Sequence, residues 1–120
     1  MTNLYQENIL DHYKNPRNFG KLKNADRKLT GANLSCGDEL TWYLKIKDGQ
    51  ITEASFTSQA CAICTASASM LSEKLVGKSI AKISTMTPEQ VTKKLGIKLS
   101  PVRLKCALLP LEALKDQGRE

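Results

Sequence analysis

The stretch from residue 40 to residue 57 constrains the fold of this 120-residue chain more than any other part of the sequence. Apolar and polar residues alternate over residues 40–47, which predicts a β-strand with one buried face. Asp48-Gly49 follows directly, and this pair is a strong signal for a two-residue hairpin turn. Residues 51–57 then form the return strand. Because a weaker strand candidate at residues 27–33 precedes the hairpin, we expect an antiparallel sheet of about three strands.

The hydrophobic pattern changes from that of a strand to that of a helix after Cys61. Residues 62–75 are small and apolar, which predicts a helix with a smooth face that can lie flat on a sheet. A short helical turn is expected at residues 79–84. Thr87-Pro88-Glu89-Gln90 has the pattern of a helix start with a capping box, and Gly96 is suited to end that helix.

The C-terminal segment, residues 104–115, is also helical in pattern but contains Pro110. Since proline is tolerated only in the first turn of a helix, we expect a break near Cys106 and a terminal helix after it. An amphipathic helix is expected at residues 4–13. Strands followed by helices indicate an α+β fold: a small three-stranded antiparallel sheet packed on one face by helices, with an N-terminal helix. The length fits a single domain over residues 1–120.

Composition argues against several classes of protein. The chain has 18 Lys and Arg against 12 Asp and Glu, but the lysines are scattered and only 5% of residues are aromatic. Nucleic-acid binders more often carry a dense basic face interleaved with aromatics, so no nucleic-acid partner is expected. No apolar run approaches the ~20 residues that span a membrane, and the N-terminus lacks a signal-peptide pattern. We therefore expect a cytoplasmic protein, whose cysteines serve metal binding or catalysis rather than disulfides.

Three of the four cysteines, Cys36, Cys61 and Cys106, lie at predicted element boundaries. Thiols at such positions can meet at one end of a domain, and a helix N-terminus favours the thiolate form. Asp38 adds a carboxylate two residues after Cys36. The alternative is that the three are unrelated core residues, as buried cysteines often are. The spacing alone leaves both interpretations open.

The fourth cysteine, Cys64, forms a CxxC pair with Cys61. The pair lacks the βαβ context of a thioredoxin-like redox motif, and it lacks the second CxxC or histidine pair of a zinc site. Cys64 either packs in the core like alanine or serine, or it acts as an extra ligand or a resolving thiol beside Cys61. His12 is the only histidine in the sequence, and we interpret it as a structural residue.

Four segments together are typical of one protein family. They are DHYKNPRN (residues 11–18), ANLSCGD (32–38), FTSQAC (56–61) followed by TASASML (65–71), and VRLKC (102–106). In their order and separations the chain resembles the IscU/SufU/NifU N-terminal family of iron–sulfur cluster assembly scaffold proteins, from Tyr5 to about Leu114.

The resemblance implies the site and its chemistry. It implies that Cys36, Asp38, Cys61 and Cys106 hold a [2Fe–2S] cluster, or zinc at the same site. It further implies that sulfur arrives as persulfide from a cysteine desulfurase, with Cys106 as the candidate acceptor. The finished cluster would then pass to recipient apo-proteins, so the chain would be a carrier rather than an enzyme. A homodimer that shares a cluster is one arrangement the resemblance allows.

The chain departs from the family pattern at Lys105, where IscU-type scaffolds have histidine before the third cysteine. SufU-type proteins have lysine there and are zinc-dependent sulfur acceptors that activate a desulfurase, but they carry an insertion that this chain lacks. The scaffold role is therefore expected, and the SufU-like role is the alternative. Lys105 is either a solvated lysine at a helix junction, or its charge favours the thiolate of Cys106 and steadies an incoming persulfide. Residues 99–103, LSPVR, match the LPPVK chaperone site only partly, so no Hsp70-type partner is expected.

Overall fold

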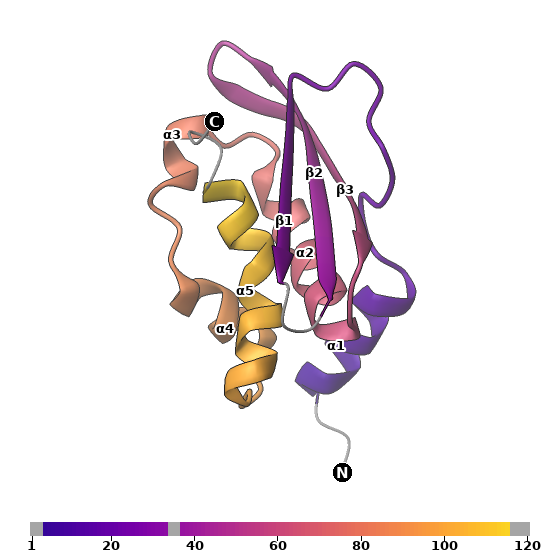
Figure 1. Cartoon of the computed structure of the whole chain (residues 1–120). Helices are drawn as coiled ribbons and strands as arrows, with labels where there is room; N and C mark the ends of the chain where they lie inside the picture. The colour runs from indigo at the N-terminus through magenta and orange to yellow at the C-terminus, as the bar shows by residue number, and fades with distance from the viewer. Residues whose placement is uncertain (1–3, 34–36, 116–120) are drawn as a thin grey trace.

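The computed structural model describes residues 4–33 and 37–115, and the remaining residues are drawn as a thin trace in Figure 1. Its elements, in chain order, are α1 (Leu4–Lys14), β1 (Arg27–Asn33), β2 (Asp38–Lys47), β3 (Gln50–Gln59), α2 (Ala62–Leu75), α3 (Ile80–Ile83), α4 (Pro88–Leu95) and α5 (Pro101–Lys115). The expected α+β fold with an N-terminal helix is confirmed.

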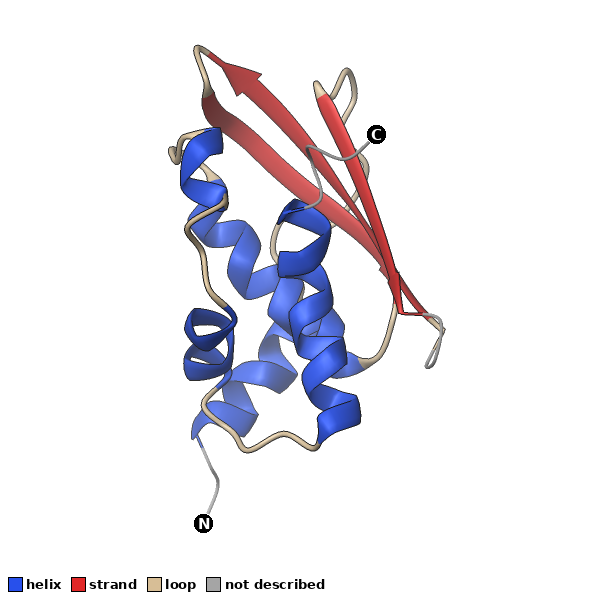
Figure 2. Ribbon diagram, turned by 60° about the vertical axis from the view of Figure 1, so that its left-hand side comes forward, coloured by secondary structure: helices blue, strands red, loops and turns tan. Residues whose placement is uncertain are grey.

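The sheet is antiparallel, with strand order β1-β2-β3. The hairpin between β2 and β3 turns at Asp48 and Gly49, whose φ angles are 53° and 76°. Two successive positive φ angles are what the twist of a two-residue hairpin requires, so the Asp-Gly signal in the sequence is borne out. The helices cover one face of the sheet, as Figure 2 shows.

The core lies between this face and the helices. Leu40, Trp42 and Leu44 alternate along β2 with fully buried side chains, and the Trp42 ring contacts that of Phe56 on β3 at a centroid distance of 5.5 Å. The central helix α2 is buried along almost its whole length, from Ile63 to Leu75. A helix buried on nearly all sides needs side chains that are apolar, or small polar ones with hydrogen-bond partners, and the alanine- and serine-rich sequence of α2 meets this requirement.

Two short helices follow α2, as predicted. The Thr87 hydroxyl accepts a hydrogen bond from the Gln90 backbone N–H, and the Gln90 side chain accepts one from the Thr87 N–H, so the capping box is present. Gly96 ends α4 in a left-handed conformation with φ 70°. None of the helices in the described part of the chain is long and apolar enough to cross a membrane.

The expected break near Cys106 is wrong. Helix α5 continues through this residue and contains Pro110 in its interior. Proline has no N–H to donate to the carbonyl four residues earlier, which belongs to Cys106. Side chains from α2 and β2 donate to carbonyls of α5 near this position. Ser67 Oγ donates to the Ala107 carbonyl at 2.7 Å, and Trp42 Nε1 donates to the Pro110 carbonyl at 2.9 Å. These contacts and the burial of Pro110 offset the cost of a proline inside the helix.

Helix α5 also lies unusually close to the sheet. A Cβ atom added at Gly31 on β1 would lie 2.9 Å from the Ala113 Cβ and 3.2 Å from the Leu109 Cδ1. Because only glycine leaves room for this approach, Gly31 sets how near α5 can come to β1.

Candidate metal centre

Three side chains from three elements meet at one end of the sheet. Asp38 is the first residue of β2, Cys61 is the N-cap residue of α2, and Cys106 lies in the second turn of α5. One carboxylate oxygen and the two Sγ atoms all lie within 4.8 Å of one another. A set of two thiols and a carboxylate at this spacing could hold a single metal ion or the edge of a cluster.

The Asp38 carboxylate is buried, with 5% of the residue exposed. Its Oδ1 accepts a hydrogen bond from the Cys61 backbone N–H at 3.1 Å. Its Oδ2 is also buried and has no hydrogen-bond partner among the described residues. A buried carboxylate oxygen without a partner is unfavourable by about 1–3 kcal/mol or more. A bound cation would supply the missing partner, so the residues present fit a metal.

The local structure around Cys61 suits a ligand. The residue has an extended backbone, with φ −67° and ψ 169°, and its side chain makes no capping hydrogen bond within the described part of the chain. The thiol is therefore not committed to the helix start and can serve as a ligand. Cys61 is half-buried whereas Cys106 is only 4% exposed, so the centre opens to solvent beside Cys61.

The other predicted site residues are placed as follows. Cys36 lies outside the described residues, and its assignment stays a prediction. Lys105 is exposed on α5, directly before Cys106. Cys64 is 0% exposed and belongs to the hydrophobic core, and it is not part of the group of converging ligand atoms found among the described residues. Its burial favours the interpretation of Cys64 as a packing residue.

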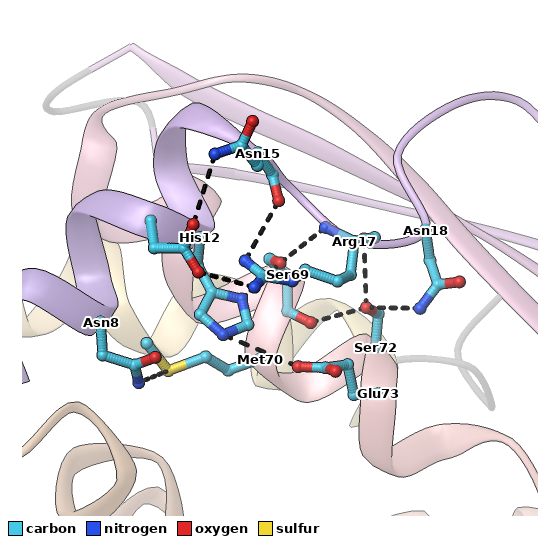
Figure 3. Close-up of polar contacts among 10 residues, drawn as sticks. Asn8, His12, Asn15, Arg17, Asn18, Ser69, Met70, Ser72 and Glu73 are labelled. Carbon is cyan, nitrogen blue, oxygen red and sulfur yellow. Dashed lines mark hydrogen bonds and ion pairs between the residues drawn. The ribbon is translucent and has the colours of Figure 1, made fainter.

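His12 points into the interface between α1 and α2 (Figure 3). Its Nδ1 lies 2.7 Å from the Ser69 hydroxyl, and its Nε2 lies 3.7 Å from a Glu73 carboxylate oxygen. Burial lowers the pKa of His12, and the nearby positive charge of Arg17 lowers it further. The residue joins two helices, in agreement with its interpretation as structural.

Two further residues of the 11–18 motif, Arg17 and Asn18, also bond to α2. The Arg17 backbone N–H donates to Ser69 Oγ at 2.8 Å, and Asn18 Nδ2 donates to Ser72 Oγ at 3.1 Å (Figure 3). The Arg17 guanidinium donates to the Asp11 carboxylate at 2.6 Å and lowers the pKa of Asp11. Sequence reasoning missed the two serines. Their position on a helix that is otherwise small and apolar is a signal that could have revealed them, because a buried hydroxyl needs a partner.

Comparison with known proteins gives a consistent result. Residues 4–117 match the family model described as the NifU-like N terminal domain. The chain is 37% identical over 112 residues to the iron–sulfur cluster assembly scaffold protein IscU 1 of Archaeoglobus fulgidus, covering 93% of this chain and 72% of that protein. It is 35% identical over 129 residues to the scaffold protein IscU of Thermotoga maritima, covering 94% of this chain and 91% of that protein.

A solved structure has the same fold. It is the crystal structure of FiSufU from Fervidobacterium islandicum, described as an iron–sulfur cluster assembly scaffold for the SUF system, with a TM-score of 0.81 and 29% identity. The alignment covers 92% of this chain and 93% of that one, so the two chains have nearly the same length. Chain length therefore does not separate IscU-type from SUF-type proteins here, contrary to the expectation from the missing insertion.

Proposed function

Because this chain belongs to the NifU-like N-terminal domain family, we propose that it is a scaffold, not an enzyme, on which iron–sulfur clusters are assembled. The observation that carries the proposal is the meeting of Asp38, Cys61 and Cys106, with a buried carboxylate oxygen that lacks a partner among the described residues. The names of the Archaeoglobus and Thermotoga relatives support the same role.

The proposed cargo is a [2Fe–2S] cluster held by Cys36, Cys61 and Cys106 with Asp38. Thiolates are the normal ligands of such clusters. A carboxylate is a harder ligand and binds iron in a cluster less tightly than a fourth thiolate would. The mixed ligand set therefore suits a protein that has to release its cargo to recipient apo-proteins. Thiolate ligands also need a reducing compartment, so we place the reaction in the cytoplasm.

Sulfur would arrive by persulfide exchange with a cysteine desulfurase. In this step the Cys106 thiolate attacks the outer sulfur of the desulfurase persulfide, a new S–S bond forms on Cys106, and the desulfurase cysteine leaves as a thiolate. The exchange needs no external electrons, and release of the sulfur as sulfide then takes two electrons from a reductant. Lys105 directly precedes Cys106 in α5 and is exposed, and its proposed role is to favour the attacking thiolate through its positive charge.

The second candidate function is that of a zinc-bound sulfur acceptor that activates a desulfurase. Two observations favour it: lysine rather than histidine precedes Cys106, and a SUF-system protein of nearly the same length shares the fold. The same three described ligands would hold zinc, whose usual ligands include thiolate and carboxylate.

Metal and sulfide analysis of protein purified without oxygen separates the two functions. Two irons and two sulfides per site support the cluster scaffold. Stoichiometric zinc without sulfide, together with strong stimulation of a desulfurase, supports the alternative. Protein that binds neither an iron–sulfur cluster nor zinc would refute both functions.

The four cysteines allow a matched mutational test of the ligand set. Cys36→Ser, Cys61→Ser and Cys106→Ser should each lose the cluster on anaerobic reconstitution with iron and sulfide. Cys64→Ala is the control, because Cys64 is of the same type but lies in the core three residues after Cys61. If Cys64→Ala lowers cluster yield as much as Cys61→Ser does, Cys64 is a ligand and the proposed set is incomplete.

A further inference from the structure

A cavity of about 660 Å³ lies between α2, α3 and α4, with one wall residue from α1. Its volume is in the range of small-molecule binding sites, which is about 300–1,000 Å³. The residues that line it include none of Asp38, Cys61 and Cys106. The cavity is therefore separate from the candidate metal centre, and nothing in the proposed scaffold function uses it.

Five apolar side chains form part of the inner surface of the cavity. Met70 and Leu71 of α2 and Val91 and Leu95 of α4 line it, and all four are buried in the protein. Met86, in the segment between α3 and α4, is half-buried and adds a flexible apolar side chain. Such a surface favours an apolar group of a ligand over water.

The rim of the cavity is strongly basic. Five lysines line it, and no aspartate or glutamate does: Lys74, Lys78, Lys82, Lys93 and Lys94. None of these lysines takes part in an ion pair identified among the described residues. Several like charges around one opening repel one another, and a bound anion would relieve that repulsion.

We propose that this cavity binds a small amphipathic anion: an apolar chain or ring system that carries a carboxylate or phosphate head group. The apolar part would rest on Met70, Leu71 and Leu95, and the head group would lie among the lysines. Fourteen residues line the cavity, whereas a standard protein interface uses about 20–30 residues on each side. The size therefore favours a small molecule over an acidic protein.

The test uses the full chain without metal, so its outcome is independent of the scaffold function. Dodecanoate and dodecyl phosphate are titrated below their micelle concentrations and followed by calorimetry, with the cationic dodecyltrimethylammonium as the charge control. We expect saturable binding of at least one anion, with one molecule per chain, and no binding of the cation. The two anions tell whether the rim prefers carboxylate or phosphate.

Two matched variants locate the binding. Lys82→Gln with Lys93→Gln removes two charges from the rim and should weaken anion binding by about five-fold, as expected for two exposed ion pairs. Lys23→Gln with Lys115→Gln removes the same charge from exposed positions outside the cavity and should change the affinity by less than about two-fold. Met86→Trp, which narrows the cavity, should weaken binding of both anions.

Three results would overturn the proposal. The first is the absence of saturable binding for both anions. The second is binding of the cation as tight as that of the anions. The third is an equal loss of anion affinity in the two lysine double variants. If a glutamate-rich peptide binds saturably and neither anionic amphiphile binds, the lysines at the rim serve a protein partner, and the proposal is overturned as well. Circular dichroism of each variant shows whether the fold is retained, and Met86→Trp provides a second test if a lysine variant unfolds.

Discussion

Replacing Gly31 with alanine tests whether the contact between β1 and α5 positions Cys106. The added Cβ would lie 2.9 Å from the Ala113 Cβ and 3.5 Å from the Ala113 Cα. Carbon atoms in good contact lie about 3.5–4.0 Å apart, so the two methyl groups must separate by at least about 0.6 Å. The Ala113 Cβ is fixed to the helix backbone and cannot rotate away. The strand or the helix has to move.

The expected cost follows from two opposing terms. Overpacking a closed contact costs about 1–3 kcal/mol. Alanine in place of glycine within a strand stabilises the folded state by about 0.5–1 kcal/mol, because alanine loses less conformational freedom than glycine on folding. The free energy of unfolding in urea should therefore fall by about 1 kcal/mol in Gly31→Ala, within a range of about 0–2.5 kcal/mol. Ala113→Gly alone should cost about 1 kcal/mol of helix propensity.

A double-mutant cycle isolates the contact. Gly31→Ala combined with Ala113→Gly should be more stable than the sum of the single changes predicts, by about 1 kcal/mol or more. Ala113 lies seven residues, or about two helical turns, after Cys106, so a shift of α5 should also weaken metal binding. The absorption of Co²⁺ bound to thiolates measures the metal affinity, and the double variant should restore the affinity that Gly31→Ala loses. Additive free energies, or an unchanged Co²⁺ affinity in Gly31→Ala, would refute the reasoning.

Three further predictions test other parts of the structure. Because the pKa of His12 is lowered in the folded protein, the imidazole of the unfolded chain takes up a proton at higher pH than that of the folded chain. The urea midpoint of unfolding should therefore fall as the pH drops below 6.5. His12→Gln should flatten this pH dependence. Asp38→Asn should raise the melting temperature of the metal-free protein and weaken Co²⁺ binding, because it removes a buried charge whose Oδ2 lacks a partner within the described chain. Ser67→Ala should cost about 1 kcal/mol in urea unfolding, since the Ala107 carbonyl loses its side-chain donor, whereas Ser84→Ala on the surface should be close to neutral.

Local sequence patterns predicted the elements whose signals are local. The Asp48-Gly49 turn, the capping box at Thr87 and the end of α4 at Gly96 all appear as expected. Each depends on backbone conformations that a few neighbouring residues dictate. The length of the strands depends on pairing, and β2 and β3 extend beyond the predicted residues at the end where Asp38 and Cys61 meet.

The candidate site was predictable in part. Cys61 lies at the start of α2 as expected, because the change of period in the sequence marks that boundary. That Asp38 and Cys61 lie side by side follows from the pairing of β2 with β3, which the Asp48-Gly49 turn predicts, together with the extension of both strands beyond the predicted residues. The position of Ser69 and Ser72 on a buried helix signals that each needs a partner, but that this partner is the 11–18 motif depends on contacts across more than fifty residues of sequence.

The error at Cys106 shows what tertiary contacts add and why the site depends on them. Propensity places a helix break before Pro110, but hydrogen bonds from Ser67 and Trp42 to α5 and the burial of the proline keep the helix continuous. Cys106 is therefore carried by a rigid helix, and its position is set by how that helix packs on β1 and α2. Asp38 and Cys61, by contrast, are joined directly by a hydrogen bond. The distance from Cys106 to Asp38 and Cys61 is thus the adjustable dimension of the candidate centre, and changes in α5 packing should alter metal affinity more than changes of similar cost elsewhere.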